Sequence, residues 1–161
     1  MHYDNSSVRR QDRLLDEPSA RRLLAGGEYG VLSLADDEGA AYGIPVSYVW
    51  NGDASLYIHC APEGRKLRCM DRQPQTSFCV VGRTALRPAQ FTTGYESIVL
   101  TCRARRGLPP GERREALRLL VEKYASEHRA TGMRYAERSF DRTEIVRLDI
   151  VQWSGKCKKV K

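Results

Sequence analysis

YIHCAPEGRK, residues 57–66, begins as a β-strand and ends in a cationic loop that is predicted to open a helix. Arg65 and Lys66 follow Gly64, and His59 stands where the strand is expected to end. Such a loop suits a phosphate, because glycine admits close backbone approach, helix N-terminal amides donate hydrogen bonds, and cations neutralise the charge. A Gly-Arg-Lys triplet is more often a solvated turn, so the loop alone does not establish a phosphate site.

Upstream of this loop, the sequence predicts one helix and a meander of three strands. The helix begins at residues 16–18, where acids and a proline occupy the first turn, and the glycine pair at 26–27 ends it. The strands cover residues 29–35, 41–50 and 55–59, with turns at 36–39 and 51–53. Pro45 lies inside the second strand and cannot donate to a ladder. That strand therefore has either a free edge or a bulge beside a pocket.

Downstream of the loop, hairpins continue to dominate. A short helix at 66–71 precedes strands at 76–82 and 95–103, which a longer connection at 83–94 separates. An amphipathic helix covers 112–124, a polar segment at 126–140 admits a second short helix, and a final strand alternates over 144–153 and closes at 154–156. Strands joined as hairpins favour an antiparallel, mainly β barrel of about six strands with peripheral helices. We expect an N-terminal arm at 1–15 and a single domain at 16–161.

Composition narrows the class of protein. The chain has 161 residues, 41% of them hydrophobic and 29% charged, which suits one globular domain. The N-terminus is polar and no apolar run reaches the length of a membrane helix, so we expect a cytoplasmic protein without a membrane segment. The five cysteines lack zinc-site spacing. The net charge of +7 is spread along the chain without interleaved aromatics, which fits an anionic small ligand as well as nucleic acid.

Several short motifs, taken in order, resemble one family. The chain is similar to the pyridoxamine 5′-phosphate oxidase-like FMN-binding split β-barrels, in the branch of the nitroimidazole-resistance (Nim) proteins. The matching stretches are residues 12–13, 28–33, 43–48, 57–61, 63–66, 91–97 and 153–156. They span nearly the whole chain. None is specific by itself, whereas the ordered set is.

The resemblance implies a split barrel that forms a homodimer with two FMN sites at its interface. It assigns the FMN phosphate to the loop that carries Gly64, Arg65 and Lys66. It places the isoalloxazine ring along the second and third strands, at Ile44, Pro45, Val46, Ser47, His59, Cys60 and Ala61. It expects the partner subunit to complete the site, with Tyr95, Glu96, Ser97 and Trp153 as candidates.

Three of these residues have alternative roles. His59 is the catalytic candidate, since it would hydrogen-bond a flavin edge or a nitro oxygen, or deliver a proton; the alternative is an imidazole satisfied by backbone at a strand end. Cys60 departs from the small residue common in this branch, and we interpret its thiol as inert. Trp153 would either stack near the ring or fill a packed core.

The resemblance therefore implies an FMN-dependent oxidoreductase that takes a hydride from NAD(P)H or another donor and reduces a small electrophile such as a nitroaromatic, a substrate inferred only from the name of the branch. Two alternatives stay open. One is a flavin or haem carrier or sensor without turnover. The other is a basic nucleic-acid-binding protein.

Overall fold

The computed structural model describes residues 1–36 and 38–160. Its strands are β1 (His2–Tyr3), β2 (Gly30–Ala35), β3 (Ala41–Val46), β4 (Val49–Trp50), β5 (Ser55–Cys60), β6 (Gln75–Arg87), β7 (Thr92–Arg105) and β8 (Glu144–Lys158). Its α-helices are α1 (Glu17–Gly26), α2 (Arg65–Arg72), α3 (Pro110–Ala125) and α4 (Arg129–Arg138). Short 3-10 turns are η1 (Gln11–Arg13), η2 (Pro88–Gln90), η3 (Ser126–His128) and η4 (Phe140–Arg142).

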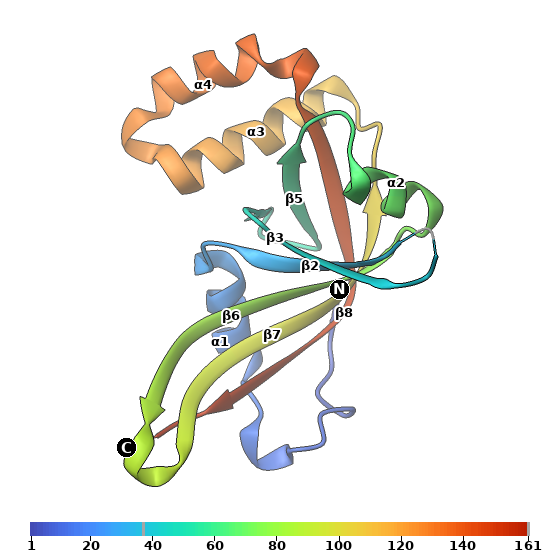
Figure 1. The fold of residues 1–161 in the computed structure, drawn as a ribbon. Coiled ribbons are helices and arrows are strands. Elements are labelled where there is room, and N and C mark those ends of the chain that lie inside the picture. The colour runs from blue at the N-terminus through green and yellow to red at the C-terminus, as the bar shows by residue number, and fades with distance from the viewer. Residues whose placement is uncertain (37, 161) are drawn as a thin grey trace.

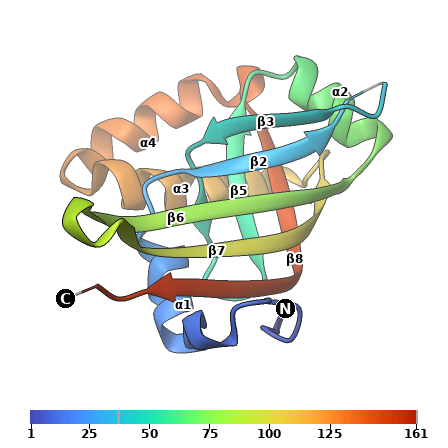
Figure 2. The same ribbon diagram turned by 60° about the horizontal axis from the view of Figure 1, so that its bottom comes forward.

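One curved sheet contains these strands (Figures 1 and 2). The strand order is β3-β2-β6-β7-β8-β5-β4, with every neighbouring pair in this path antiparallel, while β1 pairs with β8 in parallel. The two ends of the path, β3 and β4, are separated in sequence only by Ser47 and Tyr48. The sheet must therefore curl until its two ends meet, which makes a barrel. The mainly β, antiparallel fold class predicted from the sequence is confirmed.

Pro45 lies on an edge strand. β3 pairs with β2 alone along the path, and Pro45 lies opposite Val31 in an unbroken register. A proline is tolerated there because the missing N–H has no ladder partner to lose. Of the two alternatives for this strand, the free edge is the one that the structure adopts.

The largest departure from the predicted elements is a long arm formed by β6, β7 and the end of β8 (Figure 1). The sequence predicts a loose connection at 83–94, but β6 continues to Arg87 past an irregularity between Val81 and Thr84, and β7 begins at Thr92. β8 likewise continues to Lys158 along β7. The arm reaches beyond the barrel core, so its strands lack the apolar alternation by which strands are recognised.

Helix α1 closes one side of the barrel. It begins where the sequence predicts a helix start, Asp16 caps it by accepting from Ser19 N at 2.8 Å, and Ala20 and Leu24 are fully buried. The helix ends at Gly27, where a Cβ would lie 2.6 Å from Val80 Cγ1. Only glycine permits that approach. Residues 1–15 also pack, since β1 adds to β8 and Leu15 is buried.

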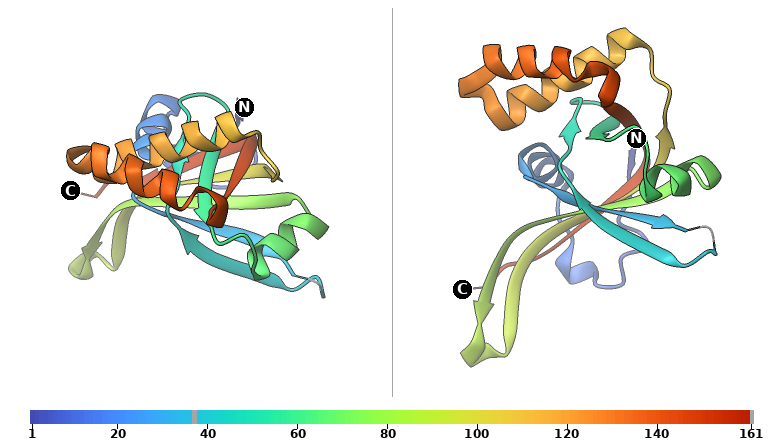
Figure 3. Two further views of the ribbon diagram at one scale, coloured as in Figure 1. Left: turned by 90° about the horizontal axis from the view of Figure 1, so that it is seen from above. Right: turned by 45° about the horizontal axis from the view of Figure 1, so that its top comes forward.

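Two apolar clusters hold the fold together. The larger fills the barrel and includes Leu32, Phe78 and Trp153. The smaller lies outside it, between the α3–α4 hairpin and the outer side of β4, β5 and β8, and includes Tyr57, Leu117 and Phe140 (Figure 3). β5 is therefore buried on both faces along most of its length. Within the described residues, the helices are all too short or too polar to cross a membrane.

Candidate functional site

A cavity of about 910 Å³ lies where the α3–α4 hairpin approaches the end of β5 and the start of α2. Helix side chains form its apolar wall, namely Leu117, Leu120, Val121, Ala125 and Ala136. Polar groups complete the lining, namely Ser47, His59, Lys66, Ser139, Arg142 and Thr143. A space of this size with one apolar wall and a few convergent polar groups is typical of a site for a small organic ligand.

The cavity brings together five of the residues predicted from the sequence: Ser47, His59, Cys60, Ala61 and Lys66. They come from three places in the chain, the β3–β4 junction, the end of β5 and the first turn of α2. The bend between β5 and α2 depends on Gly64, whose φ of 141° lies in a region that side chains rarely adopt. Gly64 O then accepts from Leu67 N and Arg68 N, which starts the helix that carries Lys66.

Arg65 departs from the prediction. Its guanidinium donates to Asp36 Oδ2 at 2.9 Å and lies 4.2 Å from the centre of the Tyr42 ring. Asp36 also accepts from the backbone N–H of Ala40, and these contacts lower the pKa of its carboxyl. Adjacent positions of a helix point in different directions, so Lys66 lines the cavity while Arg65 turns toward the β2–β3 hairpin.

Of the predicted β3 positions, only the one at its end lines the cavity. Ile44 and Val46 are half-buried and pack against the barrel core, while Pro45 is exposed on the opposite face. Because successive side chains of a strand point to opposite faces, Pro45 cannot share a face with Ile44 and Val46. Ser47 follows β3 and lines the cavity, whereas the side chain of the next residue, Tyr48, is buried.

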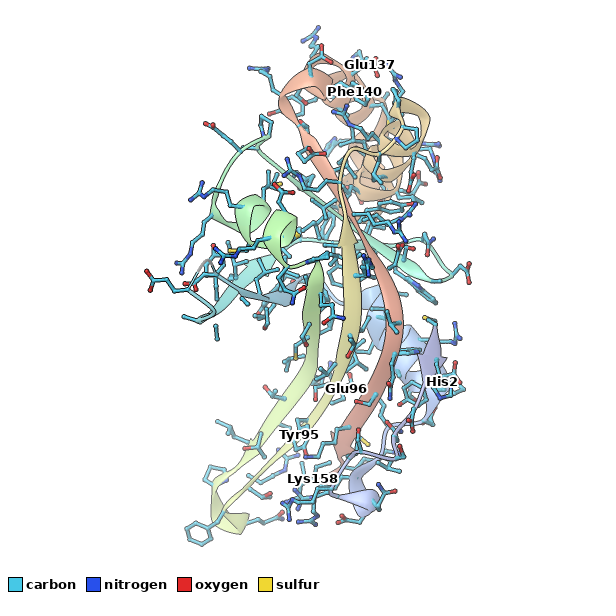
Figure 4. All side chains as sticks on the ribbon, turned by 90° about the vertical axis from the view of Figure 1, so that its right-hand side faces the viewer. His2, Tyr95, Glu96, Glu137, Phe140 and Lys158 are labelled. Atoms are coloured by element: carbon cyan, nitrogen blue, oxygen red, sulfur yellow. The ribbon has the colours of Figure 1, made fainter. Side chains whose placement is uncertain are left out.

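The residues expected to act across a subunit interface lie elsewhere in this chain. Tyr95 and Glu96 line a second cavity of about 950 Å³ on the arm, together with Arg13 and Lys158. Figure 4 places Tyr95, Glu96 and Lys158 far from Phe140, which belongs to the α3–α4 end of the molecule. Ser97 pairs with Lys156 on the same arm. One subunit alone does not bring these residues to the first cavity.

Trp153 is a core residue. It is 1% exposed and meets Tyr3 edge-on, with ring centroids 4.7 Å apart. Its indole N–H has no hydrogen-bond partner among the described residues. Of the two roles considered for Trp153, packing is the one that the geometry provides.

Two titratable groups share the strand end beside Lys66. Desolvation by the cavity walls, assisted by the Lys66 charge, lowers the pKa of His59 below its ordinary value of 6.5, so the imidazole is neutral at pH 7. Burial raises the pKa of the Cys60 thiol. A protonated thiol is a poor nucleophile, which agrees with the interpretation of Cys60 as inert.

Helix α3 is fixed to the β3–β4 junction by two neighbouring side chains. Lys123 Nζ donates to Tyr48 O at 2.9 Å and lies 3.8 Å from the centre of the Tyr48 ring. The Tyr124 hydroxyl accepts from Tyr48 N at 2.9 Å and lies 2.6 Å from Glu28 O. Gly132 lets α4 approach Val121 of α3, where a Cβ would lie 2.8 Å from a methyl carbon. These contacts fix the apolar wall in place.

Sequence reasoning did not find the part of the site contributed by residues 117–143. The amphipathic pattern of 112–124 predicted a cover over one end of the barrel, but no local motif marks Arg142 or Thr143 as cavity residues. Their position follows from the pairing of Glu144 with Cys60, which only the sheet register determines. No group of three metal-binding side chains occurs in the part of the chain that the structure describes.

Comparison with known proteins gives fold neighbours of low sequence identity. A protein assigned to 5-nitroimidazole antibiotic resistance from Bacteroides thetaiotaomicron has a TM-score of 0.72 at 17% identity, over 90% of this chain and 86% of the other. The FAD and heme binding protein from Mycobacterium smegmatis has a TM-score of 0.75 at 17% identity, over 93% and 75%. A FAD-binding protein from Mesorhizobium loti has a TM-score of 0.63 at 24% identity, over 91% and 98%.

At these identities the neighbours establish the fold and nothing finer. No curated protein matches the chain. The family model described as pyridoxamine 5′-phosphate oxidase matches residues 16–157, which is most of the chain. With the split-barrel architecture already described, this match shows that the chain belongs to the pyridoxamine 5′-phosphate oxidase family.

Proposed function

We propose that the first cavity binds FMN and that the protein is a flavin-dependent oxidoreductase. The observation that carries the proposal is the combination of a broad apolar wall with two cations that lack a carboxylate partner. Lys66 and Arg142 both line the cavity, and neither forms an ion pair within the described part of the chain. An aromatic ring system with an anionic tail has the complementary chemistry. Fold neighbours that bind a flavin support the proposal.

Five of the cavity residues have a task in this proposal. Lys66 neutralises the phosphate, and the α3 side chains Leu117, Leu120 and Val121 exclude water from the ring. His59, neutral at pH 7, would donate or accept a hydrogen bond at the ring edge or at the substrate. When bound, the flavin would supply hydride transfer from NAD(P)H to a small electrophile such as a nitroaromatic.

We further propose a homodimer. On the outer face of the sheet, Val31, Cys79 and Val99 lie side by side on β2, β6 and β7, and Val81 follows Cys79 on the same face. We call these four residues the outer patch. Val81 is 58% exposed and Val99 47% exposed in the single chain. Pairing two such faces removes apolar surface from water and would bring the Tyr95–Ser97 segment of one subunit toward the cavity of its partner.

Haem is a second candidate for the cavity. A neutral imidazole is a metal ligand, and His59 is held neutral at the cavity edge. A fold neighbour from Mycobacterium smegmatis binds both FAD and heme.

An absorption spectrum of the purified protein separates these candidates. We expect flavin bands, release of FMN on heating, and NAD(P)H consumption in the presence of a nitroaromatic. Lys66→Ala should lose most of the flavin while its circular dichroism and melting temperature stay unchanged. Matched replacement of exposed Arg134 on α4 by Ala serves as control. A Soret band would favour haem, and salt-sensitive DNA binding without a chromophore would favour a nucleic-acid-binding protein.

A further inference from the structure

Several arginines of the molecule are already neutralised. Arg106, Arg114 and Arg147 each form ion pairs, and their carboxylate partners are Asp71, Glu144, Glu137, Glu112 and Asp149. Arg65 is likewise paired with Asp36. Arg142 and Lys66 differ, because no ion pair engages either side chain among residues 1–36 and 38–160. The carboxylates named above are committed to arginines other than Arg142.

Arg142 projects from a rigid piece of backbone. Arg113 on α3 donates to the carbonyl oxygens of Phe140 and Thr143, at 2.8 Å each, and its guanidinium lies 4.2 Å from the centre of the Phe140 ring. Arg142 N donates to Ser139 O at 2.9 Å. The turn is therefore fixed on both sides of Arg142, and only the side chain remains free to find a partner. A fixed backbone reduces the entropy lost when an anion is bound.

Sheet register brings Arg142 beside the cationic loop. Cys60 pairs with Glu144 in antiparallel register, so the residues that precede Glu144 run alongside those that follow Cys60. Arg142 thus stands next to the loop at 61–64, and Lys66 lies two residues beyond that loop, in the first turn of α2. Both side chains line the same cavity, with Thr143 between the turn and β8.

We propose that Arg142 is the second phosphate-binding cation of this site and acts with Lys66 in the place that the sequence assigned to Arg65. The inference rests on the proposed binding of FMN to the first cavity. An arginine can meet a phosphate with two parallel N–H groups, and a lysine adds a point charge from the other side. A dianionic phosphate with two cations is neutralised, whereas Lys66 alone leaves one charge uncompensated.

The affinity ratio of FMN to riboflavin isolates the phosphate, because riboflavin has the same ring and ribityl chain without it. We would measure both dissociation constants by flavin fluorescence on wild-type protein, Arg142→Gln, Arg142→Lys, Lys66→Gln and Arg65→Gln. Arg142→Gln and Lys66→Gln should each raise the dissociation constant of FMN about tenfold or more and leave that of riboflavin unchanged. Arg142→Lys should recover part of the loss, and Arg65→Gln should keep the wild-type ratio.

The outcomes are distinct. If Arg142→Gln kept the wild-type ratio of FMN to riboflavin affinity, the inference would be overturned. If Arg65→Gln alone lost the preference for FMN, Arg65 would be the phosphate-binding residue. Equal loss of both flavins in Arg142→Gln would mean that the residue supports the fold of the cavity rather than the phosphate, which also refutes it. If wild-type protein binds neither flavin, the proposed function itself fails.

Discussion

At the residue scale, His59 and Lys66 are electrostatically coupled. Desolvation is the larger cause of the lowered pKa of His59, and the Lys66 charge adds to it. We therefore expect the His59 imidazole to titrate below pH 6.5 in flavin-free protein. In Lys66→Met the midpoint should rise but stay below the ordinary value, because the desolvation persists. Proton NMR of the imidazole resonances measures both midpoints.

Lys159→Met, near the C-terminus, is the matched control for this prediction. It removes the same charge from the far end of the chain and should leave the His59 midpoint at its wild-type value. If the His59 midpoint were the same in wild-type protein and in Lys66→Met, Lys66 would not face the imidazole, and its place in the cavity would be wrong.

At the element scale, the attachment of α3 to the barrel depends on a half-buried amine. Desolvation lowers the pKa of Lys123 from 10.5 to about 8. Between these values the unfolded chain binds more protons at this site than the folded one. The Lys123 contribution to the free energy of unfolding should therefore rise as the pH increases from about 8 to 10.5 and be constant below this window.

Urea denaturation at a series of pH values tests this sign. Because tyrosines and other lysines titrate in the same range, the measured quantity is the difference between wild-type protein and Lys123→Met. The free energy of unfolding of wild-type protein, relative to that of Lys123→Met, should increase as the pH rises from about 8 to 10.5. Lys159→Met, near the C-terminus, is the matched control, and an identical pH trend for Lys123→Met and Lys159→Met would contradict the assignment.

At the scale of the whole molecule, the outer patch should mediate dimer formation. A lysine placed at the centre of an apolar interface would have to be buried without a partner, which costs several kcal/mol. We expect Val99→Lys to shift the protein from dimer to monomer in sedimentation velocity and to reduce flavin content, because Tyr95 and Glu96 would no longer reach the partner's cavity. Circular dichroism should stay native, since Val99 is 47% exposed in the single chain.

Thr131→Lys is the matched control for this prediction, because it adds the same charge on the exposed side of α4. It should leave the dimer intact. A Val99→Lys protein that stays dimeric would show that the subunits associate through another face, and the assignment of Tyr95–Ser97 to the partner's site would lose its basis.

The sequence by itself determined the local structure and the family. The Asp16 cap, the alternation of the strands and the glycine bend before α2 act within a few residues, so the pattern of neighbouring residues is enough to predict them. The ordered motifs also gave the fold class, and residues 47, 59–61 and 66 do line one cavity. The prediction of a connection at 83–94 was wrong, because the exposed hairpin strands of the arm carry no apolar alternation.

Only the tertiary structure decided which cations share the cavity. Arg65 and Lys66 are neighbours in sequence, yet the helix turns one toward Asp36 and the other toward the cavity. Arg142 is distant from Lys66 in sequence, and the pairing of β5 with β8 brings it to the cavity. Trp153, a candidate for ring contact, lies in the core because of its position in the sheet. Sheet register and barrel curvature set these positions, and both depend on contacts between segments that no local pattern records.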